Sequence, residues 1–243
     1  MPHCLLAVFS HPDDETIAGP LLAKYSAEGH WVHLLTLTAG EKGLHKHAGI
    51  PAGEPLAAVR ARELDCAAAA LGLTSCTLLR FPDLGFFSAV HDPIWDDAVA
   101  AVREAIDRVS PDVVLTWGPE GGTGHPDHRA TNSVVVQAFQ QRVLLKHKPS
   151  KLYYAVFPET AGPDGWAVHT RVSREFITTD VDCNGHVHTA EKAVACHQSQ
   201  WTPEAIRMVN RLFEAAGGHI FLRLAYGTAN PASALETDIF TGL

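Results

Sequence analysis

Short apolar runs alternate with longer stretches of helical periodicity along most of the chain. The first run, residues 5–9, contains no polar side chain, which is typical of a strand buried on both faces of a sheet. We predict the strands, in chain order, at residues 5–9, 31–38, 76–79, 112–117, 152–157 and about 176–181. The helices are expected at residues 14–27, 56–71, 93–109, 127–145, 189–197 and 203–215.

This alternation predicts an α/β fold with right-handed crossovers and a mostly parallel sheet between two layers of helices. We therefore expect a three-layer α/β/α, Rossmann-like fold. No linker marks a boundary, so residues 1–243 should form one domain, with a less regular part after about residue 158 and a loose tail. Residues 40–55 are rich in glycine and proline and should form a long loop.

Composition narrows the class of protein. The chain has 243 residues, of which 46% are hydrophobic and 19% charged, as in an ordinary globular protein. The net charge of −8 argues against nucleic acid or an anionic membrane as a partner, because both reward basic surfaces. The apolar start is too short for a signal peptide, and no window approaches the roughly 20 apolar residues of a membrane span.

The five cysteines are scattered, odd in number and never spaced as Cys-x-x-Cys. This pattern argues against a disulfide framework and against a cysteine zinc site. We therefore expect reduced thiols and a cytoplasmic protein.

Two polar motifs each follow a predicted strand. HPDDE at residues 11–15 follows the first strand, and GGTGHPDH at residues 121–128 follows the fourth. Ligands of a doubly wound sheet bind at this carboxyl edge, where the strand order reverses. If the first and fourth strands are neighbours, the two motifs face each other there.

The spacing within both motifs suits a metal. His11 and Asp14 are three residues apart, as are His125 and His128, so each pair can share one face of a helical turn. Two histidines and one carboxylate with an open fourth position form a known catalytic zinc arrangement, although iron, cobalt or nickel also fit. Alternatively, the aspartates cap helices and the prolines belong to ordinary turns. Two His-Pro-Asp sequences, each after a buried strand, make coincidence a weak explanation.

The two motifs together resemble those of the LmbE-like (PIG-L) family of zinc N-deacetylases, which act on N-acetylglucosaminyl compounds. Supporting stretches are RARE at residues 60–63, FPD at 81–83 and HQSQ at 197–200. The resemblance implies that His11, Asp14 and His128 bind Zn²⁺ and that Asp13 is the general base.

The resemblance also implies that His125 stabilises the tetrahedral intermediate or protonates the leaving amine, with Asp127 tuning or orienting His125. Arg60 and Asp83 are candidate substrate-binding residues, each with an ordinary alternative as a solvated helix charge or a turn residue. Some family members carry a tyrosine where this chain has Thr123, so the tyrosine's oxyanion role is open here.

Glu15 and His197 each have two candidate roles. Glu15 either closes the pocket or accepts from backbone donors at the helix start. His197 fits a packed or capping histidine better than one at the metal.

The expected function is a metal-dependent hydrolase that removes the acetyl group of an N-acetylated, N-acetylglucosamine-containing small molecule by attack of zinc-activated water. The resemblance makes a homo-oligomer a further expectation. A non-sugar amide is an alternative substrate, and a non-catalytic metal-binding protein is an alternative class. A nucleotide-binding protein is disfavoured because the turn after the first strand reads SHPDD instead of a glycine-rich phosphate loop.

Overall fold

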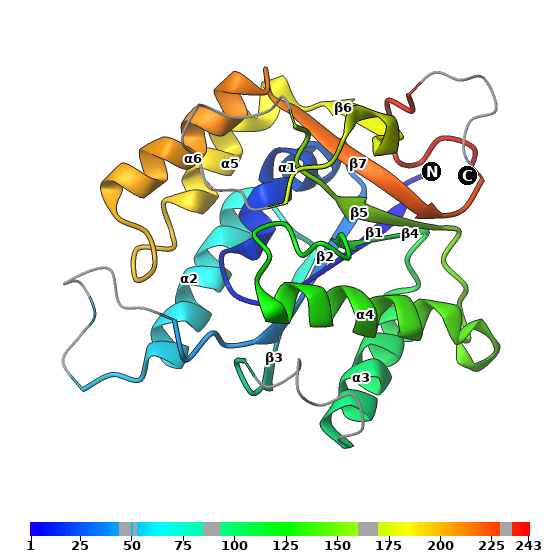
Figure 1. The fold of residues 1–243 in the computed structure, drawn as a ribbon, viewed down its shortest axis with the longest axis horizontal. Coiled ribbons are helices and arrows are strands. Elements are labelled where there is room, and N and C mark those ends of the chain that lie inside the picture. The colour runs from blue at the N-terminus through cyan, green and yellow to red at the C-terminus, as the bar shows by residue number, and fades with distance from the viewer. Residues whose placement is uncertain (44–49, 51–52, 85–92, 160–169, 229–234) are drawn as a thin grey trace.

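The computed structural model describes residues 1–43, 50, 53–84, 93–159, 170–228 and 235–243. Within these residues, seven strands form one sheet in the order β3-β2-β1-β4-β5-β7-β6 (Figure 1). The strands are β1 (Cys4–Phe9), β2 (Trp31–Thr38), β3 (Ser75–Phe81), β4 (Val113–Trp117), β5 (Lys151–Ala155), β6 (Thr179–Asp182) and β7 (His219–Tyr226). The first five are parallel, and β7 is antiparallel to both of its neighbours.

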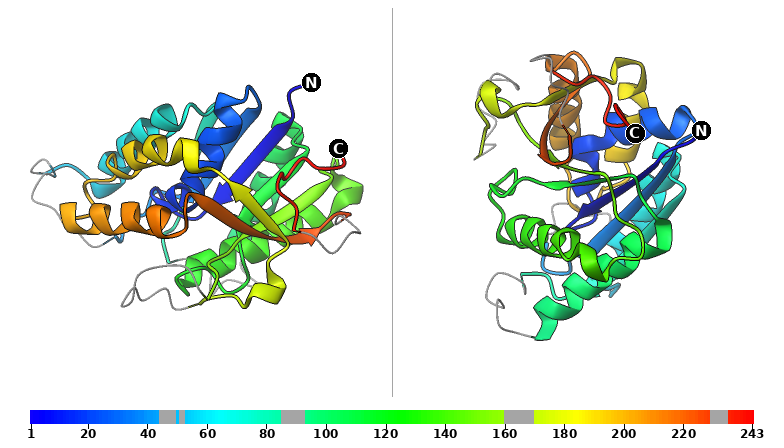
Figure 2. Two further views of the ribbon diagram at one scale, coloured as in Figure 1. Left: turned by 90° about the horizontal axis from the view of Figure 1, so that it is seen from above. Right: turned by 90° about the vertical axis from the view of Figure 1, so that its right-hand side faces the viewer.

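Helices cover both faces of the sheet, so the predicted three-layer α/β/α fold is confirmed (Figure 2). One face packs against α1 (Gly19–Ala27) and α2 (Leu56–Leu71), with α5 (Val187–Val194) beside them. The other face packs against α3 (Pro93–Val109) and α4 (Pro126–Gln140). The remaining helix, α6 (Pro203–Ala215), lies against α5.

Strand β1 shows why its sequence is apolar throughout. Leu5, Ala7 and Phe9 belong to the hydrophobic cluster on the α1 side, whereas Leu6 and Val8 belong to the cluster on the α3 side. Successive side chains of a strand point to opposite faces, so a strand covered on both sides needs apolar residues at every position.

The order of the strands places the two polar motifs side by side. β1 pairs with β2 on one side and with β4 on the other, so the chain winds in opposite directions from this point. The HPDDE motif follows β1 and the GGTGHPDH motif follows β4 at the same carboxyl edge. The predicted neighbourhood of the first and fourth strands is therefore confirmed.

Several predicted elements have different bounds. The helix expected at residues 14–27 begins as a 3-10 turn, Asp14–Ala18, before α1. α4 ends at Gln140 instead of residue 145, and a 3-10 turn follows at Arg142–Leu144. β6 begins at Thr179, because residues 174–176 form another 3-10 turn.

Strand β7 was not predicted, because the chain after residue 215 was interpreted as a loose tail. The structure instead inserts β7 between β5 and β6. Of the loop expected at 40–55, residues 44–49 and 51–52 lie outside the described residues. No helix of the described chain is long and apolar enough to cross a bilayer.

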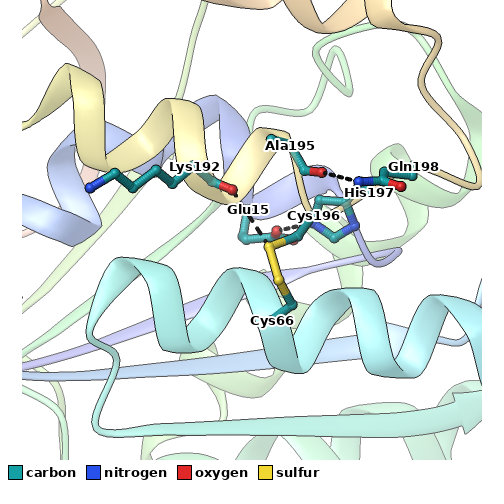
Figure 3. The surroundings of a disulfide bond; sticks show 7 residues. All are labelled: Glu15, Cys66, Lys192, Ala195, Cys196, His197 and Gln198. Atoms are coloured by element: carbon teal, nitrogen blue, oxygen red, sulfur yellow. Dashed lines mark hydrogen bonds and ion pairs between the residues drawn. A yellow bond between two sulfur atoms is a disulfide. The ribbon is translucent and has the colours of Figure 1, made fainter.

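A disulfide joins Cys66 of α2 to Cys196, which lies just after α5, and the expectation of reduced thiols is wrong at this pair (Figure 3). The two cysteines are 130 positions apart in sequence, and their Cα atoms are 5.9 Å apart. Their spacing gives no local pattern, so only the packing of α2 against α5 reveals the pair. The cytoplasmic location stays a prediction, but the cysteines no longer support it.

Candidate active site

Asp14 lies in the 3-10 turn after β1, and one of its carboxylate oxygens is held by three donors. Oδ2 accepts the backbone N–H of Ser10 at 3.0 Å and of His11 at 2.9 Å, and lies 3.3 Å from Nε1 of Trp117. Oδ1 therefore remains the outward oxygen. It lies 3.2 Å from Nε2 of His128.

His128 lies in the first turn of α4, and its neighbours fix its tautomer. Pro126 occupies the first helical turn, and His125 caps the helix. Nδ1 of His128 is 3.0 Å from the carbonyl oxygen of Gly121, which can only accept, so Nδ1 carries the proton. The free lone pair is then on Nε2, facing Asp14. The ring of Trp117 stacks on His128 with centroids 4.2 Å apart.

His11 is fixed in the opposite tautomer to His128, with the proton on Nε2 and the lone pair on Nδ1. Its Nε2 is 3.3 Å from Oδ2 of Asp127 and 3.3 Å from Oδ1 of Asp83, so Nε2–H donates to carboxylates. Its Nδ1 is 3.5 Å from Asp14 Oδ2 and keeps the lone pair. Histidines that bind metals usually donate their other ring nitrogen to a carboxylate or carbonyl in this way.

These three side chains fit a divalent metal. Two donor atoms on one tetrahedral zinc lie about 3.3 Å apart, close to the 3.2 Å between Asp14 Oδ1 and His128 Nε2. Nδ1 of His11 lies 3.5 Å from Oδ2 of the same carboxylate. The donor set, two imidazoles and a carboxylate, suits zinc.

His125 is close enough to be a further ligand, since its ligating atom lies within 4.8 Å of those of His11 and His128. However, its Nδ1 accepts the backbone N–H of Asp127 at 3.2 Å, so the proton is on Nε2. A nitrogen that carries its proton cannot bind a metal. The lone pairs that face one another in this part of the site are therefore those of His11 Nδ1, Asp14 and His128 Nε2.

The charges around the three side chains favour a cation. Burial would lower the pKa of His11, but hydrogen bonds to Asp127, Asp14 and Asp83 outweigh it and raise that pKa well above its usual value. Burial would raise the pKa of Asp14, yet His128 and His11 hold it well below its usual range. The site thus concentrates carboxylates where positive charge is stabilised.

The pKa of His125 shifts in the opposite direction. Burial lowers it, and the nearby imidazoles of His11 and His128 lower it further. His125 is therefore neutral near pH 7, in agreement with the tautomer that the Asp127 N–H imposes. Its Nε2–H is the donor that remains for a ligand.

Asp13 is held at both carboxylate oxygens. Oδ1 is 3.0 Å from Nη2 of Arg60, and Oδ2 accepts from Nε1 of Trp201 at 2.8 Å. Its backbone has φ of 105°, which is uncommon for a residue with a side chain. The backbone N–H of Asp13 donates to Glu15 Oε2 at 3.0 Å.

Arg60 reaches this position because the opposite loop carries Gly40. Its Nη1 donates to the Gly40 carbonyl at 2.9 Å, and its Nη2 contacts the Pro12 carbonyl. Gly40 has φ of +62°, and a Cβ there would overlap the guanidinium. Arg60 thus links α2, the turn after β1 and the loop after β2.

Glu15 and His197 form a buried pair (Figure 3). Both are fully buried, and His197 Nε2 lies 2.6 Å from Glu15 Oε1. Burial would lower the pKa of His197, but the negative charge of Glu15 raises it above its usual value. The expectation for Glu15 as an acceptor of backbone donors agrees with its bond to Asp13.

The structure brings seven of the eight predicted site residues to one pocket: His11, Asp13, Asp14, Arg60, Asp83, His125 and His128. The guanidinium of Arg60 is directed at Asp13 and at carbonyl oxygens. The carboxylate of Asp127 faces His11 instead of His125, which it meets only through its backbone N–H. Thr123 also lines the pocket, with Oγ1 3.4 Å from Nδ1 of His128.

Sequence reasoning missed two tryptophans. Trp117 ends β4 and Trp201 directly follows the HQSQ stretch, so both lie next to motifs that were singled out. Their indoles meet Asp14 and Asp13, respectively, across 103 and 188 positions of the chain. No local pattern reveals such contacts.

The same pocket extends beyond the polar cluster, with a volume of about 430 Å³. Such a size is typical of sites for small molecules. The ends of β5 and β7 and one face of α6 form the rest of its wall.

Residues 6–139 match the model of the PIG-L family, described as GlcNAc-PI de-N-acetylase. A 1D-myo-inositol 2-acetamido-2-deoxy-alpha-D-glucopyranoside deacetylase of Catenulispora acidiphila is 30% identical over an alignment that covers 100% of this chain and 98% of the relative.

Two solved structures share the fold. The N,N'-diacetylchitobiose deacetylase of Pyrococcus horikoshii has a TM-score of 0.68 and 20% identity, over 94% of this chain and 87% of the other. The 4-carboxy-2-hydroxymuconate hydratase of Pseudomonas putida has a TM-score of 0.70 and 18% identity, over 96% of this chain and 100% of the other. Because one of these enzymes hydrolyses an amide and the other hydrates, the fold alone does not decide the reaction.

Proposed function

Because this chain belongs to the PIG-L family of GlcNAc-PI de-N-acetylases, we propose that it removes the acetyl group from an N-acetylated amino sugar carried on a small molecule. The observation that carries the proposal is that His11, Asp14 and His128 converge in one pocket that Asp13 and His125 also line.

His11 Nδ1, Asp14 Oδ1 and His128 Nε2 would hold the metal, and zinc suits this donor set. When bound, zinc would lower the pKa of water to about 7 and polarise the amide carbonyl. Gly121, Asp83 and Asp127 fix the two imidazoles in the tautomers that such binding needs.

Asp13 takes the proton of the attacking water as the new C–O bond forms. Arg60 and Trp201 fix the carboxylate in one orientation, which gives the base a defined geometry. When the C–N bond breaks, the same carboxyl returns the proton to the leaving amine. The products are acetate and a free amino sugar.

His125 donates Nε2–H to the oxygen on which negative charge develops. Its neutral tautomer and its lowered pKa support this role over that of a general acid. Between the two roles that the resemblance implies, we assign the oxyanion role.

Acetate release tests the proposal. Purified protein loaded with zinc should release acetate and free amine from methyl N-acetylglucosaminide, and a chelator should abolish this release. Amine release from simple acetamides but not from the amino sugar would support the alternative of a non-sugar amidase. Tight zinc binding without any amide hydrolysis would support the non-catalytic alternative.

Two further properties belong to the same proposal. We expect a protein that acts in the cytoplasm on a small molecule and assembles as a homo-oligomer. Light scattering coupled to size exclusion would determine the number of copies.

A further inference from the structure

The wall of the pocket changes character away from the metal-binding end. There it is formed by α6 and by the segments at the ends of β5 and β7. The apolar residues of this wall are Phe157, Val209, Leu212, Phe213, Ile220 and Phe221. We call this set the apolar wall.

Polar side chains near the apolar wall already have partners in the protein. Nδ1 of His219 forms an ion pair with Asp180 Oδ1 at 2.6 Å. Nη1 of Arg171 donates to the carbonyl oxygen of Glu159 at 3.0 Å. Each contact occupies one nitrogen, so Nε2 of His219 and the other guanidinium N–H groups of Arg171 remain available, and the apolar character of this end comes from the six residues of the apolar wall.

The polar end of the pocket holds the groups that would contact the acetamide: Asp13, His125 and the three metal-binding residues. The apolar wall lies in the same 430 Å³ cavity. A group attached to the amino sugar can therefore extend along it. A ring of hydroxyl groups placed there would lose its hydrogen bonds to water without replacing them.

We infer that the substrate carries an alkyl or aryl group that packs against the apolar wall. The inference rests on the proposed deacetylase function and narrows its substrate class. The group is either the aglycone of an N-acetylglucosaminide or a longer N-acyl chain, since both present the same apolar surface. The relative named above acts on an inositol glycoside, and this chain should differ from it.

The test compares two series of substrates on the zinc-loaded enzyme. One series has methyl, hexyl and myo-inositol aglycones on N-acetylglucosamine, and the other has N-acetyl and N-hexanoyl groups on methyl glucosaminide. Because burial of each methylene contributes a severalfold gain, kcat/KM should rise at least about tenfold from methyl to hexyl, or from acetyl to hexanoyl. The series that shows the gain identifies the source of the group.

Rates within about threefold in both series, or a myo-inositol glycoside better than the hexyl glycoside, would overturn the inference. Amine release from none of the compounds would instead contradict the proposed function. Titration calorimetry then decides the inference separately. Tenfold tighter binding of the hexyl than of the methyl glycoside, or of the N-hexanoyl than of the N-acetyl compound, supports it, and equal binding within both pairs overturns it.

Two substitutions on α6 locate the effect. Leu212 lines the pocket, whereas Met208, one turn earlier, is 44% exposed and does not. In the series that shows the gain, Leu212→Asn should reduce the kcat/KM ratio of the longer to the shorter substrate by about tenfold, and Met208→Asn should leave it unchanged. An equal ratio in both variants would place the apolar group elsewhere and contradict the inference.

Discussion

At the scale of single residues, neighbours hold Asp13 in an uncommon backbone conformation. Its φ of 105° is unfavourable for a residue with a Cβ. Contacts at both oxygens and at the backbone N–H hold it there. Such conformations persist only where neighbours over-determine them, and they cluster at functional sites.

Removing the indole hydrogen bond should therefore loosen Asp13. Trp201→Phe keeps the ring and deletes Nε1–H, so we expect kcat to fall about tenfold, as hydrogen bonds to charged groups contribute about 1.5–3 kcal/mol. Zinc content should not change. Trp95→Phe is the matched control, because Trp95 Nε1 donates to Gln137 Oε1 at 2.8 Å away from the pocket. Equal activity of the two variants would show that Trp201 does not position Asp13.

Asp127 should act on the metal through His11. Asp127→Asn weakens the acceptor of His11 Nε2–H, so we expect a zinc dissociation constant about 10–100 times larger. Competition with a chromogenic chelator measures it. Asp112→Asn is the control, since Asp112 accepts the Cys4 backbone N–H at the opposite end of β1. Unchanged zinc affinity in Asp127→Asn would refute this role.

The sequence identified the residues that lie in motifs, because His11, Asp14 and His128 sit at fixed spacings after buried strands. It did not identify what those residues touch. The contacts of Trp201 with Asp13 and of Asp127 with His11 depend on the packing of distant segments. The substrate-binding roles of Arg60 and Asp83 stay predictions, and the carboxylate oxygens of Asp83 contact Lys42 and His11.

At the scale of elements, the segment after α5 is tied to α2 at two points. Cys196 forms the disulfide with Cys66, and Ser199 donates to Glu63 through its backbone N–H and its hydroxyl, each at 2.6 Å. This segment also carries His197 and Trp201, which contact Glu15 and Asp13. Because this segment is held against α2, His197 and Trp201 are held beside Glu15 and Asp13.

Loss of the disulfide should destabilise the protein. The bond closes a long stretch of chain, and disulfides of this kind contribute about 2–4 kcal/mol by restricting the unfolded state. We expect this decrease in the unfolding free energy for Cys66→Ser with Cys196→Ser, measured by urea denaturation. The cysteine control is Cys76→Ser, at a residue with a free thiol. If wild type is equally stable with and without a reductant, the bond does not contribute.

The buried pair of His197 and Glu15 should make stability depend on pH. The pKa of His197 is raised in the folded protein by Glu15, with smaller contributions from Asp13 and Glu63. Its stabilisation is complete below the unfolded value of about 6.5 and is lost as pH rises through the folded value.

His197→Ala should therefore reduce the unfolding free energy more at pH 6 than at pH 9, with a loss of about 3 kcal/mol at the lower pH. Denaturation of both proteins at the two pH values gives this difference. A loss that is equal at both values would mean that His197 does not change its protonation in this range.

Most helices and strands could be predicted, because strands buried on both faces and amphipathic helices have distinct patterns. α2, α3 and α6 have the predicted bounds. β7 was missed although Ile220 and Leu222 alternate with more exposed positions, because its role depends on pairing with β5 and β6.

At the scale of the whole molecule, the reversal of strand order between β1 and β4 makes the site. The C-terminal part completes it, since β7 joins the same sheet and α6 lines the pocket. Near the C-terminus, Glu236 contacts Lys151 and Tyr153 of β5. The extent of a single domain over residues 1–243 stays a prediction, which one cooperative unfolding transition would support.

The central claim is tested most directly by measuring zinc content and acetate release together on the wild type, Asp13→Asn and His128→Ala. We expect one zinc and deacetylation in the wild type, and one zinc with about 10²–10⁴-fold slower turnover in Asp13→Asn. His128→Ala should lose both the metal and the activity. Wild-type turnover in Asp13→Asn, or full zinc occupancy in His128→Ala, would contradict the account.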